Sequence, residues 1–245
     1  MFETLVNLFF LLFFLSFAIF QGIFLNKIFG FKFNDKLELY VLSYGLGVIY
    51  IIFITILLSF LGILKSSYLY IIIFFSYLPI FFIKNTIAKN HYIKYDYKSF
   101  IKQDWLPVLI LILTSIIFLI SSLAPPLDGD TLIGYLDVPR RYVFAEGFTE
   151  LPFEIFSSLP LNMQMLSSFG IAFHNDILAI LIVGFTMSFA TASVIIILAK
   201  KYFNMTVAVW AAILFLTTYS VQFLVAGAKV NLGRSFFDLL ALYSF

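Results

Sequence analysis

The chain has 245 residues, of which 62% are hydrophobic and only 11% are charged, and its net charge is +2. An ordinary soluble domain is about 45–50% apolar and about 25% charged, so this composition indicates a multi-pass membrane protein. The small net charge and the lack of a Lys/Arg cluster argue against a nucleic-acid partner. Because the sequence contains no cysteine, disulfides, thiolate nucleophiles and cysteine-ligated metals are excluded.

Apolar segments follow one another along the whole chain. A helix needs about 20 apolar residues to cross the hydrocarbon core of a membrane. Six segments meet this requirement: 4–25, 39–64, 66–83, 105–124, 177–199 and 206–228. The first lacks a basic leader and a small-residue cleavage site, so it is predicted to be a retained span.

A seventh apolar segment begins near Val230 and continues to Phe245. Its 16 residues would form a helix of about 24 Å. This is shorter than a hydrocarbon core of about 30 Å. We therefore expect the chain to be the N-terminal part of a longer protein, and the alternative is a tilted last helix that ends in the membrane.

Basic residues alternate between the connecting loops. Ten of the fifteen lie in the first, third and fifth loops: Lys27, Lys32, Lys36, Lys84, Lys89, Lys94, Lys98, Lys102, Lys200 and Lys201. Loops rich in Lys and Arg tend to stay in the cytoplasm, so these three are predicted to be cytoplasmic. The N-terminus, the turn at Lys65, and residues 125–176 and 226–231 are then predicted to be external, on the periplasmic side of the inner (plasma) membrane.

The external segment 125–176 gathers acidic residues. Six of the thirteen in the chain lie between residues 121 and 154: Asp128, Asp130, Asp137, Glu146, Glu150 and Glu154. Residues 130–146 have a helical apolar pattern, which Pro139 is expected to kink or to divide into two helices. Residues 161–173 are expected to form a second short helix at the membrane interface.

The motif Asp128-Gly129-Asp130 directly follows the fourth span and the two prolines at 125–126, which cannot continue a helix. Carboxylates held at the membrane surface could reach a lipid headgroup, and Arg140 and Arg141 add cations suited to a phosphate. Two simpler interpretations remain. The acids could be a solvated surface, or Asp130 could be the N-cap of a helix beginning at Thr131.

From about Trp105 to its end, the chain resembles the membrane glycosyltransferases of the GT-C fold, which include protein O-mannosyltransferases and lipid A aminoarabinose transferases. The stretches that carry the resemblance are PPLDGDTLIGYLDVPRRYVFAEGF (125–148), LPFEIFSSLPLNMQML (151–166) and the closely spaced spans that follow. The most similar group consists of bacterial members. The resemblance implies an all-α polytopic protein with about seven transmembrane helices and a large external loop bearing interfacial helices.

The matched region defines a module at 105–245, with its external loop at 125–176. The three N-terminal spans and basic loops at 1–104 lie ahead of this region and depart from the family pattern. The resemblance also implies transfer of a sugar from a polyprenyl-phosphate donor to an external glycan, lipid or protein of the cell envelope. In that family an Asp just after the matching span is the catalytic acid/base. Here this is Asp130, with Asp128 as the other member of the motif.

Four external basic residues are candidates for contacting the donor phosphate: Arg140, Arg141, Lys229 and Arg234. Where relatives often place a second acid at the mouth of a later span, this chain has Asn231, in AKVNLGRSFFDLL. This difference leaves use of a divalent metal open, and no cofactor is assigned. His174 is expected at the interface, and His91 lies in the basic third loop, so neither indicates a metal site.

Two other function classes remain. The main rival is a transporter or flippase of lipid-linked intermediates, and the third candidate is a polymerase or ligase of surface polysaccharide. Transporters place ionisable residues or broken helices near the middle of the membrane. The six complete apolar segments contain no Asp, Glu, Lys or Arg, and the polar residues lie in an external loop. This distribution favours an enzyme.

The predicted orientation can be tested with single cysteines, because the chain has none of its own. A membrane-impermeant maleimide should label Ser157→Cys in intact cells and should not label Ser99→Cys. Labelling of Ser99→Cys would overturn the orientation and remove the acidic loop from external chemistry.

Overall fold

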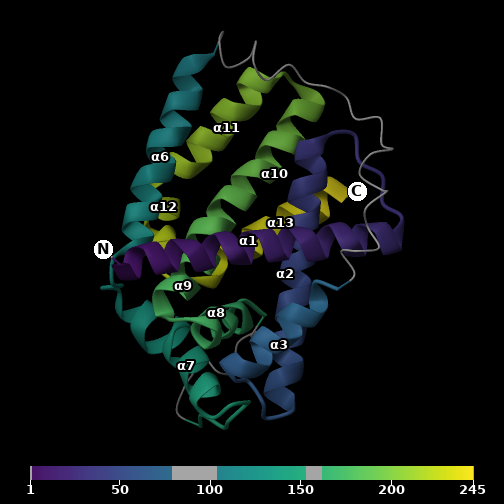
Figure 1. Cartoon of the computed structure of the whole chain (residues 1–245). Coiled ribbons are helices and arrows are strands. Elements are labelled where there is room, and N and C mark those ends of the chain that lie inside the picture. The colour runs from purple at the N-terminus through teal and green to yellow at the C-terminus, as the bar shows by residue number, and fades with distance from the viewer. Residues whose placement is uncertain (1, 79–103, 153–161, 245) are drawn as a thin grey trace.

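The computed structural model describes residues 2–78, 104–152 and 162–244, and the described residues form helices and no strands (Figure 1). The helices are α1 (Phe2–Phe29), α2 (Lys36–Phe60), α3 (Ser66–Ser76), α6 (Trp105–Leu123), α7 (Asp137–Phe144), α8 (Asn162–Phe173), α9 (Asp176–Ile180), α10 (Met187–Tyr202), α11 (Met205–Thr217), α12 (Tyr219–Val225) and α13 (Val230–Ser244). Two π-helical segments, η2 (Thr131–Tyr135) and η4 (Leu181–Thr186), lie before α7 and between α9 and α10.

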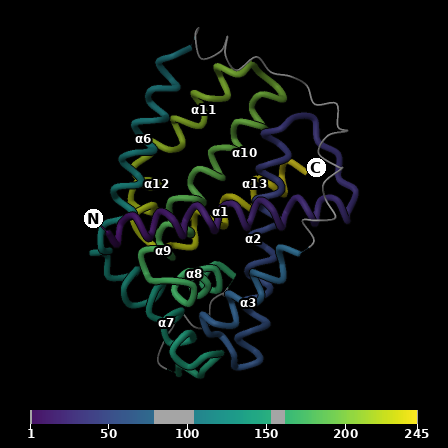
Figure 2. Tube along the Cα trace, in the orientation of Figure 1, coloured from purple at the N-terminus to yellow at the C-terminus, as the bar shows by residue number. Residues whose placement is uncertain are grey.

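Four single helices in the described part of the chain are long and apolar enough to cross a membrane: Phe2–Phe29, Lys36–Phe60, Trp105–Leu123 and the continuous helix Asp176–Tyr202. Counting α11 and α12 as one bent span gives a fifth. These helices fit the predicted class, an all-helical polytopic membrane protein. In Figures 1 and 2, α1 runs across α10 and α2 rather than alongside them, so the apolar helices do not form a simple parallel bundle.

The expected seven spans are not all present as such. In the described residues the third is represented by the 11-residue helix α3, and residues 79–83 of the expected span lie outside the described ranges. The seventh is the 15-residue helix α13. The sixth, predicted as one segment at 206–228, is divided into α11 and α12, which meet at an angle of 67°.

The break between α11 and α12 lies at Thr218, whose backbone is extended. The Thr217 and Thr218 hydroxyls donate to helical carbonyls one turn earlier, and the Gln222 side chain donates to the Thr217 carbonyl at 3.0 Å. These side chains take up backbone acceptors at the interruption, which an apolar environment requires. The segment from α11 to α12 contains no proline, and its bend lies at these three polar side chains.

Small residues bring α1 and α2 into close contact. A Cβ added at Gly22 would overlap the carbonyl oxygen of Ser43, and one added at Gly47 would overlap that of Ala18. Close approach through small residues four apart is a common way for membrane helices to associate. Asn26 also donates to the Ser43 hydroxyl at 2.7 Å within this contact.

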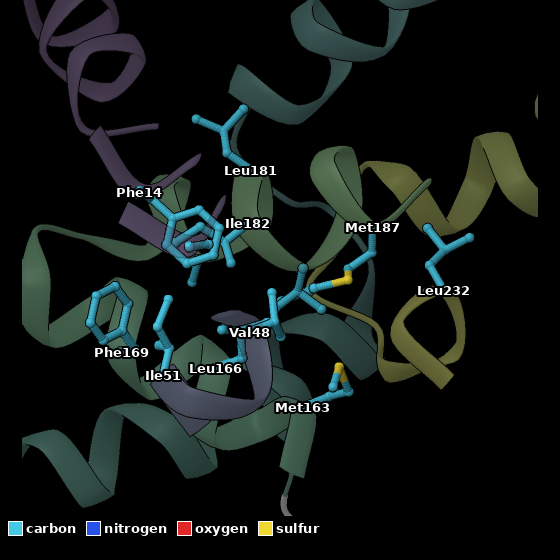
Figure 3. Close-up of a cluster of buried hydrophobic side chains, with 14 of the residues drawn as sticks. Phe14, Val48, Ile51, Met163, Leu166, Phe169, Leu181, Ile182, Met187 and Leu232 are labelled. Atoms are coloured by element: carbon cyan, nitrogen blue, oxygen red, sulfur yellow. The ribbon is translucent and has the colours of Figure 1, made fainter. Parts of the chain in front are cut away.

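A short helix is present where one was expected at residues 161–173, and this helix, α8, packs in the core of the described structure. Ten of its twelve residues are buried. Its hydroxyls can be buried because Ser167 and Ser168 donate to carbonyls four residues earlier. In Figure 3, Leu166 and Phe169 of α8 point toward Phe14 of α1 and Ile51 of α2.

Polar contacts join the connecting segments in two groups. One group links segments predicted to be cytoplasmic: the Asp35–Lys200 ion pair, and the hydrogen bond from Thr206 to Asp104 at 2.7 Å. The other links segments predicted to be external: Leu64 N–H to the Glu146 carbonyl at 2.7 Å, Lys65 to Glu146 at 2.7 Å, and Lys229 to Asp128 at 2.9 Å. Segments predicted on the same side therefore contact one another. The lysines at 84, 89, 94, 98 and 102, together with Ser99, Ser157 and Glu154, lie outside the described residues.

The α1–α2 contact predicts a stability effect. Gly47→Leu should lower the free energy of unfolding by about 2 kcal/mol or more, because the added side chain must separate two touching backbones. Thermal unfolding in detergent measures this. Gly129→Ala is the control, since a Cβ there meets no atom within 4 Å and should leave the midpoint unchanged. Equal midpoints for Gly47→Leu and the parent chain would contradict the packing described.

Candidate functional site

The acidic turn after α6 is held in place by a helix cap. The helix ends at Leu123, and the following prolines direct the chain away from it. The Asp128 carboxylate then accepts hydrogen bonds from the Thr131 backbone N–H at 3.0 Å and from its hydroxyl at 2.9 Å. This is the geometry of an N-cap. The alternative interpretation of Asp130 as the cap is wrong, because Asp130 makes no capping bond.

Lys229 reaches the same carboxylate from the turn between α12 and α13. Its Nζ lies 2.9 Å from Asp128 Oδ2 and 3.8 Å from Asp130 Oδ2. It also lies 4.2 Å from the centre of the Phe223 ring, and only 7% of its side chain is exposed. The hydrogen bond from Lys229, together with those from Thr131, holds the pKa of Asp128 below its ordinary value. Asp128 therefore stays ionised at neutral pH, and the pair is lost only as the pH falls through that lowered pKa.

Two π-helical segments flank the turn that carries Lys229. A Cβ at Gly227 would lie 2.6 Å from the Thr131 hydroxyl of η2, and one at Gly184 of η4 would overlap the Val225 carbonyl. The Ser122 hydroxyl, near the end of α6, donates to that same carbonyl at 3.1 Å. The turn is thus fixed from three sides. Short π-helical segments inside helices are frequent at functional sites.

Asp130 is the available carboxylate of the motif. Its side chain is 69% exposed, and its ion-pair partner within the described residues is Lys229 at 3.8 Å. A distance of that length is too great for a hydrogen bond. Asp130 can therefore accept a proton or a hydrogen bond from a ligand without first breaking a strong contact.

The four predicted phosphate-binding cations do not gather in one place. Arg140 makes two hydrogen bonds to Asp176, at 2.6 and 3.0 Å, which raise its pKa and join α7 to α9. Arg141 is paired with Asp137 on its own helix at 2.6 Å. Arg234 is the most accessible, with 83% of its side chain exposed and a weak contact to Asp238 at 3.6 Å.

A cavity of about 930 Å³ lies between α2, α8 and α13 and reaches η2. One wall is apolar and consists of α2 residues: Ile49, Ile52, Phe53 and Ile56. The polar lining residues are Tyr135, Asn162, Gln164, Asn231, Arg234 and Asp238. The cavity suits a ligand that has an apolar part and a polar part. The sequence did not reveal this cavity, because residues 49–56 have only the composition of a span. The feature that could have indicated it is the three polar residues of α13, Asn231, Arg234 and Asp238.

Among the described residues, no group of three His, Asp or Glu side chains could hold a metal ion. His174 stacks on the Phe10 ring with centroids 4.4 Å apart, and burial lowers its pKa. His174 is therefore packed against α1 rather than lying free at the interface, and His91 lies outside the described residues.

Comparison of the chain with models of protein families, with curated proteins and with solved structures finds no match. The site must therefore be interpreted from its own geometry.

The contact between η2 and the Lys229 turn predicts a disulfide. The position of Gly227 beside the Thr131 hydroxyl places the two Cβ atoms within the about 3.5–4.5 Å that a disulfide needs. Thr131→Cys combined with Gly227→Cys should oxidise readily, which gel mobility with and without reductant after proteolysis between the two sites will show. Thr131→Cys with Ser244→Cys serves as the control and should stay reduced. A reduced Thr131/Gly227 pair under the same oxidant would disprove the contact.

Proposed function

We propose that the chain acts as a membrane glycosyltransferase, which moves a sugar from a polyprenyl-phosphate donor to an external glycan, lipid or protein. What supports this most is the cavity between α2, α8 and α13, which combines an apolar wall with a charged and amide-bearing side. The segment η2 contributes Tyr135 to that cavity and begins immediately after Asp130. The accessible carboxylate of Asp130 therefore directly precedes the short segment that contributes Tyr135 to an amphipathic cavity.

The proposed chemistry assigns one task to each charged group. Asp130 accepts the proton of the acceptor hydroxyl as its oxygen bonds to the anomeric carbon of the sugar. The bond between that carbon and the phosphate oxygen breaks, and polyprenyl phosphate leaves with the electron pair. Arg234, the most exposed cation of the cavity lining, is suited to stabilise the charge on the departing phosphate. A bound donor that excludes water would strengthen both interactions.

We propose that the transfer takes place on the external side of the membrane, as the distribution of basic residues predicts. A lipid-linked sugar is already activated, so its transfer needs no nucleotide on the external side of the membrane. Lys65, Glu146, Asp128 and Lys229 contact one another in pairs within the segments assigned to that side. This grouping is consistent with an external site in the plasma membrane.

A transporter or flippase of lipid-linked intermediates is the second candidate, and two interrupted helices favour it. The α11–α12 pair is broken by a 67° bend, and η4 interrupts the regular hydrogen bonding of another candidate span. Transporters often bind substrates at interrupted helices. The break at Thr218, however, is satisfied by the chain's own hydroxyls and amide, whereas Asp130 is left accessible.

Asp130→Asn tests the proposed general base. The change keeps the size of the side chain and breaks no capping bond, so abundance should be unchanged. Transfer should fall by at least about 100-fold, because general bases typically contribute about 10²–10⁴-fold. The measurement is transfer of labelled sugar from a polyprenyl-phosphate pool to envelope material in cells lacking the native protein.

The matched control is Asp137→Asn, which lies on the following helix and loses only a surface pair with Arg141. It should be nearly silent. Should Asp130→Asn keep more than about a tenth of the activity while Asp128→Asn abolishes it, the wrong carboxylate has been chosen. If neither change matters, the transporter becomes the better candidate.

Arg234→Ala tests the phosphate contact. Its loss should raise the KM for the donor by about tenfold and change the KM for the acceptor much less, since the cation contacts only the donor. Arg141→Ala, already paired outside the cavity, is the control and should keep parental kinetics. Parental donor kinetics for Arg234→Ala would show that the phosphate binds elsewhere.

A further inference from the structure

Lys229 has an unusual environment for a residue first considered as a phosphate contact. Only 7% of its side chain is exposed, although it is the cation nearest to the acidic motif. A buried ammonium group costs free energy unless a partner compensates it. Here the Asp128 carboxylate and the Phe223 ring occupy its surroundings, at 2.9 and 4.2 Å.

We propose that Lys229 is a positioning residue, which locks the acidic turn against the α12–α13 turn and so holds Asp130 in place as the base. The inference rests on the proposed function for Asp130, but the lock itself is a physical contact that can be measured without any activity.

Two features of the geometry support a lock rather than a ligand contact. Lys229 Nζ lies within hydrogen-bonding distance of Asp128 and 0.9 Å farther from Asp130, at 2.9 against 3.8 Å. The Lys229 ammonium group therefore pairs mainly with Asp128, the residue that caps the helix. The neighbouring Gly227 packs on Thr131, the residue that Asp128 caps, so one contact surface includes the cap, the lysine and the glycine.

The contact of Lys229 with Asp128 also gives Asp128 and Asp130 different roles. Asp128 and Asp130 are two residues apart, and two adjacent carboxylates repel each other unless a cation lies between them. Lys229 supplies that cation. Asp128 then serves as the cap and counter-ion, and Asp130, two residues later, is left exposed for chemistry.

A double-mutant cycle tests the proposal. Lys229→Met should lower kcat by about tenfold with the donor KM nearly unchanged, because it leaves Asp128 uncompensated and loosens the turn. Asp128→Asn removes the charge that Lys229 balances, so the double variant should be less impaired than the two single losses multiplied. Lys229→Arg, which keeps the charge, should retain most of the activity. An increase in donor KM for Lys229→Met that Asp128→Asn does not relieve would instead make Lys229 a phosphate contact.

A second measurement does not depend on activity. In the Thr131→Cys/Gly227→Cys background, Lys229→Met should slow disulfide formation by about tenfold. Lys201→Met, an equal loss of charge on an exposed lysine at the end of α10, should not change the rate. If the parent chain shows no sugar transfer, the proposed function fails while this rate still decides the lock. If Lys229→Met leaves the rate of disulfide formation unchanged, Lys229 does not hold the two turns together.

Discussion

The burial of one lysine charge determines the arrangement around the acidic turn. Lys229 can occupy a site with 7% of its side chain exposed because Asp128 lies 2.9 Å away. Asp128 in turn caps the helix that begins the loop, and Gly227 beside the lysine allows η2 to approach. Removing Asp128 would leave the Lys229 charge buried without its nearest carboxylate, removing Lys229 would leave Asp128 without its cation, and a side chain at Gly227 would overlap Thr131. The exposed position of Asp130 is a consequence of contacts made by its neighbours.

The same constraint, that polar groups in an apolar protein need partners, explains other irregular parts of the fold. At the α11–α12 break, Thr217, Thr218 and Gln222 supply the missing hydrogen bonds. At the opposite end of the described structure, Asp35 caps α2 and pairs with Lys200 of α10. Two acids that cap helices, Asp35 and Asp128, thus also bind a lysine from a distant part of the chain. Each links two segments that are far apart in the sequence.

Sequence patterns could predict the general class of the protein and which of its connecting segments contact one another. Composition indicated a helical membrane protein, and the distribution of lysines placed in one group the segments that Asp35–Lys200 and Thr206–Asp104 join. The acidic motif was also found from its position after a proline pair. These signals are local or compositional, so they do not depend on knowing which helices touch.

Other features depend on tertiary contacts and could not be predicted. The spacing Asp-Gly-Asp allows either acid to cap the helix, and only the position of Lys229 selects Asp128. The burial of α8 follows from its contacts with α2, α3, α7 and α9, which its mixed composition does not reveal. The contact of Gly22 with Ser43 and the cavity beside Arg234 likewise join residues that are distant along the chain. The resemblance to GT-C glycosyltransferases is an interpretation of the sequence, and the proposed function adds to it the amphipathic cavity and the exposed Asp130.

The proposed function requires that the bond between the sugar and the lipid phosphate is broken, with Asp130 as the base, and that the donor is not merely carried across the membrane. The most direct measurement uses the purified chain in proteoliposomes that contain a labelled polyprenyl-phosphate sugar, with envelope acceptor added outside. Labelled acceptor and free polyprenyl phosphate should form in equal amounts. Movement of intact donor between the leaflets, with no free polyprenyl phosphate formed, would contradict the proposed function.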